Sequence, residues 1–382
     1  MPRDAVVVEA VRTPIGKRRG AYADVHPVDL SAHVLDALAH RSGLDPALVD
    51  DVVWGVVEQV GEQAFNLGRS AVLAADWPES VPAVTVDRQC GSSQQAVHFA
   101  AAGVISGQYD IAVAGGVESM TRVPMGTASG GDLERPMGPM AASRYAGQRI
   151  HQGLGAELIA EKWGLSRQQV DEYAATSHER AAAAIDSGAF EKQYAVVPGS
   201  GLSVDEGVRR GTNVESLSKL KPVFKEDGVV HAGNASQMSD GSGALLITTS
   251  ERARELGMKP LVRLHTFAVA ADDPVMVLTG PIPATAKALA RSGLSIGDIG
   301  AFECNEAFAP VVLAWLAETG ADPALVNPLG GAIAVGHPLG GSGAILMTRL
   351  IHHMVDNRIR YGLQTMCEGG GLANATILEL IP

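Results

Sequence analysis

The sequence predicts an α/β fold built from two similar halves and a long insertion. Short apolar runs alternate with alanine-rich segments, a pattern typical of strands that are covered by helices on both faces. The tetrapeptide RSGL occurs at residues 41–44 and again at residues 291–294. The alternation is interrupted between residues 119 and 238. We therefore expect an internal duplication with a separate segment inserted into it.

The two halves match in the order of their elements around this tetrapeptide. Each copy follows a helical segment and precedes an acidic turn and a short strand. Cys90 lies 46 residues after Leu44, and His337 lies 43 residues after Leu294. Each stands at a turn that leads into an apolar helix, and both halves then close with an apolar strand that runs into glycines. This agreement supports the duplication.

The inserted segment has a different composition. It begins rich in Met, Gly and Pro, continues with two polar helical stretches and ends in a charged loop. We interpret it as a loop or lid domain that covers one half. The predicted domains are an N-terminal half, a lid and a C-terminal half: residues 1–118 completed by 239–261, residues 119–238, and residues 262–382.

Composition limits the classes of function. Of the 382 residues, 46% are hydrophobic and only 4% aromatic, so the core is built mainly from Ala, Val, Leu and Ile. The net charge of −12 argues against a general nucleic-acid or anionic-membrane surface, although a local basic patch could bind an anionic ligand. Three cysteines without a C-x-x-C pair fit neither a disulfide framework nor a zinc site. The apolar run near the N-terminus is too short for a signal peptide, so we expect a soluble cytoplasmic protein without a bound metal.

Cys90 stands at a joint that is unusual for a thiol. In VDRQCGSSQQAV (residues 86–97), a strand that we expect to be buried ends near Val86, and an apolar helix follows that ends near Gly107. Unpaired N–H groups and the macrodipole at a helix N-terminus favour a thiolate. Hydrolases display nucleophiles on a similar strand–turn–helix joint. Cys90 is therefore a candidate nucleophile, and a small buried core residue is the alternative.

His337 and Cys367 are two further candidates. GHPLGGSG (residues 336–343) places an imidazole among small residues, at the duplicated counterpart of the Cys90 loop. A histidine beside a cysteine is a common means of activating the thiol. Cys367 precedes EGGG, where a thiol can act as acid or base and glycine N–H groups can bind an oxyanion. On position alone, a structural histidine and a buried cysteine at a strand end remain the alternatives.

Six segments together resemble the thiolases, which are acetyl-CoA acyltransferases, over essentially the whole chain. They are RTPIGKRRG, CGSSQQA, AGNASQMSDGSGA, NEAF, GGAIAVGHPLGGSG and CEGGG, in family order and at roughly family spacing. The resemblance implies two βαβαβαββ halves in a five-layered αβαβα arrangement with an inserted loop domain. It also implies CoA-dependent cleavage of a 3-ketoacyl-CoA to acetyl-CoA and a shortened acyl-CoA, or the reverse condensation, through an acyl-cysteine intermediate. CoA and acyl-CoA would be substrates, and no cofactor would be permanently bound.

The resemblance also implies a role for each catalytic candidate. Cys90 would be the nucleophile, and His337 would activate it. Asn305 of NEAF would hold a water that completes an oxyanion hole with His337, and Cys367 would shuttle a proton at the substrate α-carbon. The N–H groups of Cys90 and Gly369 would form a second oxyanion hole. The reaction itself needs these groups, because it requires a nucleophile that is also a good leaving group, donors for an enolate oxygen and a proton for its carbon.

An acidic protein needs local cations to bind the phosphates of CoA. GVRRGT (residues 207–212) supplies Arg209 and Arg210, and a solvated charged turn is the alternative for both. Through the resemblance we expect seven residues to contact CoA, the first three at adenine and phosphate and the next two at pantetheine: Arg209, Ser216, Leu217, His151, Ser236, Ala232 and Phe308.

Departures from the family pattern bear on the substrate. Gln94 and Gln95 follow the nucleophile turn, and Glu368 stands beside the proposed base. We interpret the glutamines, with Met366, as signs of an acyl site different from that of the small biosynthetic thiolases. Capping of the first helical turn is the alternative for the glutamines. The segments around the two reactive cysteines look most like actinobacterial thiolases of β-oxidation and steroid breakdown, which handle acyl groups larger than acetyl.

Three other functions compete with a degradative thiolase. One is a biosynthetic thiolase that condenses two acetyl-CoA molecules. A decarboxylating condensing enzyme of the same fold would have histidine or asparagine where this chain has Cys367. A non-catalytic CoA-binding protein would not need the full set of catalytic residues. We interpret Cys304 and Glu306, which flank Asn305, as structural. We also expect a homodimer, paired into a homotetramer as is common among thiolases, from the stacked apolar halves and the Met- and Pro-rich loop at residues 120–145.

Overall fold

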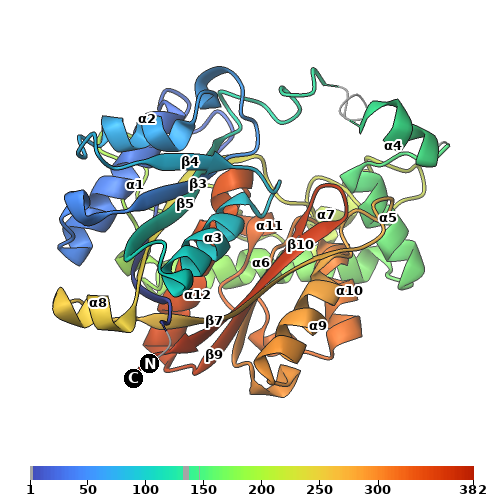
Figure 1. The fold of residues 1–382 in the computed structure, drawn as a ribbon. Coiled ribbons are helices and arrows are strands. Elements are labelled where there is room, and N and C mark those ends of the chain that lie inside the picture. Colours follow the sequence, from blue (N-terminus) through green and yellow to red (C-terminus); the bar gives the residue numbers. More distant parts are fainter. Residues whose placement is uncertain (1–2, 132–136, 146) are drawn as a thin grey trace.

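The computed structural model describes residues 3–131, 137–145 and 147–382. The N-terminal half follows a βαβαβαββ order, and its last strand comes after the insertion (Figure 1). A short strand, β2 (Gly16–Lys17), pairs with that last strand. The main elements of this half are β1 (Val6–Arg12), α1 (Pro27–Ser42), β3 (Asp51–Gly55), α2 (Leu67–Ala74), β4 (Ala83–Val86), α3 (Ser92–Ser106), β5 (Ile111–Ser119) and β6 (Ser239–Thr248).

The C-terminal half repeats this order, and the short helix α8 (Ser250–Glu255) precedes it. Its elements are β7 (Val262–Ala271), α9 (Pro281–Ser292), β8 (Ala301–Cys304), α10 (Ala309–Thr319), α11 (Ala332–Val335), α12 (Ser342–Asn357), β9 (Tyr361–Glu368) and β10 (Leu372–Leu380). A single bridge between Phe302 and Val326 takes the place that β4 has in the first half. The prediction of two similar α/β halves is confirmed.

The two RSGL copies adopt the same local conformation. Gly43 caps α1 and Gly293 caps α9, with φ angles of 69° and 73°. Glycine adopts this left-handed region without the strain that a side chain adds. Ser42 and Ser292 donate hydrogen bonds back to carbonyl groups of the last helical turn. The repeated tetrapeptide is therefore a shared helix C-cap.

The strands form one hydrogen-bonded sheet in the order β4-β3-β5-β6-β1-β7-β10-β9-β8. Only two residue pairs, Val6 with Arg263 and Val7 with Val262, join β1 to β7 and so connect the halves. α1 and α2 cover the N-terminal strands, and α9 and α10 cover the C-terminal strands. α3 and α12 lie between the two sets of strands and contact both (Figure 1). This is the expected αβαβα layering.

The middle layer brings the first turns of α3 and α12 into close contact. A Cβ atom added at Gly343 would overlap the backbone nitrogen of Gln94. The N–H group of Ala344 donates a hydrogen bond of 2.9 Å to the Ser93 hydroxyl. Glycine at position 343 therefore lets the loop of the candidate base approach the loop of the candidate nucleophile.

Strand β4 differs from the expectation of a buried strand. It lies at the edge of the sheet, and Val84 remains 41% exposed. An edge strand leaves one side of its backbone without a strand partner. The expectation was wrong because local hydrophobicity does not show which strand ends a sheet.

The insertion contributes α4 (Gly138–Arg144), α5 (Gln152–Lys162), α6 (Arg167–Asp186) and α7 (Val214–Ser218). α5 and α6 pack against α10, and α6 also packs against α11 (Figure 1). The insertion therefore contacts the C-terminal half. Residues 132–136 of its Met- and Pro-rich stretch lie outside the described residues, and the three-domain division stays a prediction. Within the described ranges, no helix is long and apolar enough to cross a bilayer.

Candidate active site

Cys90 lies in a constrained turn between β4 and α3. Gln89 has a φ of 48°, in the left-handed region that a non-glycine residue seldom adopts. The Ser92 hydroxyl accepts a hydrogen bond from the Arg88 N–H group (2.9 Å) and donates one to the Gln89 carbonyl (2.6 Å). Gly91 then caps α3. The turn thus places the thiol at the start of a buried helix, as predicted from the sequence.

The environment of Cys90 opposes the expected easy ionisation. Burial raises the pKa of its thiol to about 12, and the acidic residues Glu368, Glu118 and Asp87 add to the increase. Desolvation therefore outweighs the helix N-terminus that the sequence analysis emphasised. At neutral pH Cys90 is a thiol, and it needs a base to become a nucleophile.

His337 is a buried imidazole whose tautomer follows from its hydrogen bonds. Its Nδ1 lies 2.6 Å from the Ser342 hydroxyl, which donates its only proton to the Pro338 carbonyl (2.9 Å). Nδ1 must therefore carry a proton and donate it to Ser342, so Nε2 has a free lone pair. Burial lowers the pKa of His337 to about 4. The ring is neutral at physiological pH and can accept a proton at Nε2.

The backbone before His337 requires glycine. Gly336 has a φ of 110°, and a Cβ atom at this position would overlap the Ser239 hydroxyl. The His337 N–H group lies 3.0 Å from the Gln237 carbonyl and 3.2 Å from the Ser239 hydroxyl, and both accept from it. Ser239 and Ser342 cannot be recognised as positioning groups from the sequence, because only the fold brings these hydroxyls to the histidine.

Asn305 lies beside His337, as the resemblance implied. Its Nδ2 is 3.5 Å from His337 Nε2, and its backbone N–H group donates to the Thr365 carbonyl (3.0 Å). Its buried Oδ1 has no hydrogen-bond partner among the described residues. A buried polar atom of this kind is available to a substrate or a water. A water held by Asn305, together with His337 once Nε2 has taken a proton, can donate hydrogen bonds to one oxyanion.

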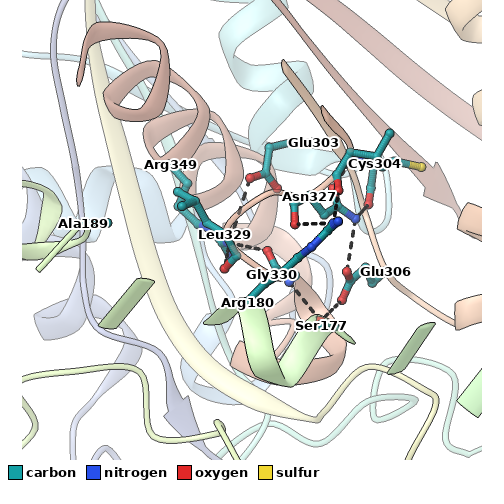
Figure 2. Close-up of polar contacts among 12 residues, drawn as sticks. Ser177, Arg180, Ala189, Glu303, Cys304, Glu306, Asn327, Leu329, Gly330 and Arg349 are labelled. Atoms are coloured by element: carbon teal, nitrogen blue, oxygen red, sulfur yellow. Dashed lines mark hydrogen bonds and ion pairs between the residues drawn. The ribbon is translucent and has the colours of Figure 1, made fainter. Parts of the chain in front are cut away.

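Figure 2 shows the buried polar network behind the NEAF turn. Glu306 accepts hydrogen bonds from the Ser177 hydroxyl (2.6 Å) and from the Ile333 N–H group (3.1 Å). Asn327 Nδ2 donates to Glu306 (3.2 Å) and to the Cys304 carbonyl (2.8 Å). These contacts tie the NEAF turn to α6 and to α11, which precedes His337. They agree with a structural role for Glu306 and Cys304.

Cys367 and Gly369 complete the group. Cys367 is fully buried in an apolar cluster that includes Phe308. Burial raises the pKa of its thiol well above the usual range, and the nearby Cys90 adds to the effect. A Cβ atom added at Gly369 would lie 3.0 Å from Gln89 Oε1, so the CEGGG turn packs against the nucleophile turn. The fold thus places Cys367 and Gly369 at the nucleophile turn and Asn305 beside His337, and it packs the end of the His337 loop against the first turn of α3.

Three of the expected CoA contacts line one surface groove. Arg209, Ala232 and Ser236 lie on a groove of about 480 Å³ that also has Lys17 and Arg18 on its wall. Glu206 also lines the groove and pairs with Lys17 (3.3 Å), so Arg18 and Arg209 are the two cations of the groove that are not paired with it. Gln237, whose carbonyl holds the His337 backbone, is part of the same wall. The groove adjoins the candidate base.

The other expected CoA contacts lie on neighbouring elements. His151 begins α5, and its ring lies 5.4 Å from that of Phe224, which lies 6.1 Å from that of Phe308. Leu217 is buried, and a Cβ atom added at Gly233, the residue after Ala232, would overlap its side chain. Ser216 completes the capping box of the short helix α7.

The structure separates the two arginines of GVRRGT. Arg209 lines the groove with the cations described above. Arg210 instead forms two hydrogen bonds of 2.7 and 2.8 Å with Asp186 on α6. Of the two arginines in GVRRGT, only Arg209 therefore remains a candidate for CoA phosphate.

The interpretation of Gln94 as an acyl-site residue is wrong. Its Nε2 donates to the Thr376 hydroxyl (2.8 Å), and its Oε1 accepts from Gln364 Nε2 (2.9 Å). The side chain thus bridges α3 to β9 and β10 inside the middle layer. It neither caps the helix nor faces a substrate, because its hydrogen bonds are made by the packed sheet.

Comparison with known proteins identifies the family. The model of the thiolase N-terminal domain matches residues 5–251, and that of the thiolase C-terminal domain matches residues 258–380. A steroid 3-ketoacyl-CoA thiolase of Mycobacterium tuberculosis is 50% identical over 384 residues, which cover 98% of this chain and 94% of that protein. The 3-ketoacyl-CoA thiolases of Pseudoalteromonas translucida and Escherichia coli are 44% and 43% identical, with coverage of 98% of this chain and of 98% and 99% of those proteins. The chain belongs to the thiolase family and is an acetyl-CoA C-acyltransferase.

Proposed function

We propose that this thiolase works in the degradative direction and cleaves 3-ketoacyl-CoA through an acyl group carried on Cys90. The observation that supports this most is that the buried Cys367 thiol lies near Cys90, while the start of α12, which follows the His337 loop, packs against the start of α3. The relatives named as 3-ketoacyl-CoA thiolases, one of them for steroids, support a role in β-oxidation of fatty acids or steroids. The biosynthetic alternative has no such support.

The first half-reaction uses Cys90, His337, Asn305 and Cys367. His337 Nε2 takes the proton of the Cys90 thiol, and the sulfur attacks the 3-keto carbon of the substrate. The bond between the α and β carbons breaks and leaves an acyl group on Cys90 and the enolate of acetyl-CoA. The protonated His337 and a water on Asn305 stabilise the enolate oxygen. Cys367 gives its proton to the enolate carbon, which completes acetyl-CoA.

The second half-reaction restores the enzyme. The Cys367 thiolate takes the proton of the incoming CoA thiol, and the CoA sulfur attacks the acyl group on Cys90. The N–H groups of Cys90 and Gly369 stabilise the oxyanion of this step. The leaving Cys90 thiolate recovers its proton from His337. Every proton is returned, and in this scheme the reaction needs CoA as a substrate and no permanently bound cofactor.

Arg209 is expected to hold CoA phosphate. Arg209→Ala should raise the KM for CoA roughly tenfold with little change in kcat, because a charge-assisted hydrogen bond contributes about 1.5–3 kcal/mol. Arg210→Ala is the matched control, since Arg210 is committed to an exposed ion pair with Asp186. Initial rates of thiolysis, measured over a range of CoA concentrations, give kcat and KM for both variants. Equal KM values in the two variants would contradict the assignment.

The acyl substrate is expected to be larger than acetoacetyl. Thiolysis rates for acetoacetyl-CoA, for medium-chain and for ring-derived 3-ketoacyl-CoAs should show kcat/KM rising with size, because each buried methylene contributes about 0.8 kcal/mol. A preference for acetoacetyl-CoA, without any gain for longer chains, would instead indicate the small-substrate alternative.

We also propose a homodimer, paired into a homotetramer, in the cytoplasm. The edge strand β4 leaves backbone groups without a strand partner, and apolar side chains are exposed on the same half: Phe65, Leu73, Val84 and Phe99. Light scattering that gave the mass of a single chain at micromolar concentration would contradict the assembly. The free cysteines, two of which have proposed roles as thiols, support a reducing compartment.

A further inference from the structure

Glu368 has a position that the proposed reaction does not use. It ends β9 directly after Cys367, and because side chains alternate along a strand the two residues face opposite sides. A Cβ atom added at Gly91 would overlap Glu368 Oε1. Asn374, on the neighbouring strand, donates a hydrogen bond of 3.1 Å to the Gly91 carbonyl. The carboxyl group is therefore packed against the residue that follows Cys90.

The Glu368 carboxyl group is buried without hydrogen bonds that would compensate for its loss of solvation. The residue is fully buried, and neither of its carboxyl oxygens has a hydrogen-bond partner among the described residues. A carboxylate in such surroundings is costly unless it is paired. Burial raises the pKa of Glu368 to about 8; Arg88 opposes this rise and Asp87 adds to it. Glu368 is thus largely a neutral acid at neutral pH.

The charge of Glu368 acts directly on the nucleophile. After burial, Glu368 is the strongest influence that raises the pKa of Cys90. Two negative charges that share a site of low dielectric disfavour each other. The charged or titratable groups that face Glu368 are Arg88, Asp87 and Cys90 from the nucleophile turn, with Cys367 beside it on β9.

We infer that Glu368 is a positioning residue that controls the reactivity of Cys90. In its neutral form it fills the space behind the nucleophile turn and adds no charge that would oppose formation of the Cys90 thiolate. In its charged form it holds Cys90 as the thiol. This inference rests on the proposed role of Cys90 as the nucleophile, and it concerns a carboxyl group that takes no proton from the substrate.

Alkylation of Cys90 by iodoacetamide between about pH 6 and pH 10, with the site identified by mass spectrometry, tests this inference without any substrate. Glu368→Gln keeps the shape and removes the charge. Wild type and variant should react equally near pH 6, and the variant should react about fivefold faster near pH 9 and close to tenfold faster near pH 10, which corresponds to about one pKa unit at Cys90. Equal rates at every pH, or a slower variant, would overturn the inference.

Two further measurements make the result specific. Glu303→Gln is the matched control, because burial also raises the pKa of Glu303, to about 7, but Glu303 is not among the groups that influence Cys90. It should follow the wild-type profile. If Glu368→Gln does not fold, the wild-type profile alone tests the inference, since its logarithmic rate should rise less steeply with pH above about pH 8, where Glu368 ionises. A uniform rise through pH 9 would overturn the inference. Loss of acyl transfer to Cys90, in contrast, would overturn the proposed function and leave this profile unchanged.

Discussion

Replacement of Cys90 by alanine is expected to abolish acyl transfer and to lower kcat for thiolysis by roughly 10⁴-fold or more, the scale of loss for a covalent nucleophile. Without the sulfur, the nucleophile turn has no group that can both attack the 3-keto carbon and leave in the second step. Incubation with acetoacetyl-CoA, followed by quenching and intact-mass measurement, should show an acetyl adduct on the wild-type chain. The adduct should be absent from Cys90→Ala, and its persistence would rule out the proposed intermediate.

Cys304→Ala is the matched control for this experiment. Cys304 is a second buried cysteine in the C-terminal half, at the end of β8. Its backbone groups bond to Asn327 at 2.9 and 2.8 Å, and alanine keeps both bonds. The substitution should leave a small cavity, cost about 1 kcal/mol of unfolding free energy and preserve the adduct.

His337→Ala and Cys367→Ala are expected to affect different steps. Loss of the imidazole should slow formation of the acyl-enzyme by roughly 10²–10⁴-fold, the usual contribution of a positioned base. Loss of the Cys367 thiol should instead suppress exchange of the acetyl-CoA α-protons with solvent deuterium. Rapid-quench mass measurement follows the first step, and proton NMR in deuterium oxide follows the second. If Cys367→Ala exchanged the α-protons at the wild-type rate, this cysteine would have no role in the proton transfer.

The pH dependence of acylation gives a second test of His337. Because burial lowers its pKa to about 4, the base form should persist well below the ordinary histidine range of about 6.5. The acylation rate should therefore lose its His337-dependent part only as the pH falls towards 4. His353→Ala on α12, an imidazole that contacts Asn357, should leave the profile unchanged. A decrease in the acylation rate with an apparent pKa near 6.5 would contradict the assignment of His337 as a buried neutral imidazole.

The sequence by itself determined the architecture and the candidates for the reacting groups. Alternating apolar segments and the RSGL caps are local features, and each determines the conformation of a single element, as the helix caps Gly43 and Gly293 do. The candidates Cys90 and His337 stand beside glycines in turns that precede apolar helices, and Cys367 stands near the end of an apolar strand that runs into glycines. Such positions are readable without tertiary contacts because the chemistry and the backbone requirement lie within a few residues of each other.

Only the tertiary structure decided the properties that depend on which surfaces meet. Packing turned Gln94 into the middle layer, separated Arg209 from Arg210 and placed β4 at the sheet edge. It also reversed the expected shift at Cys90, since the helix N-terminus is local whereas the desolvation and the Glu368 carboxyl come from distant segments. Burial and electrostatic coupling are sums over neighbours in space, and these neighbours are set by the fold of the whole chain.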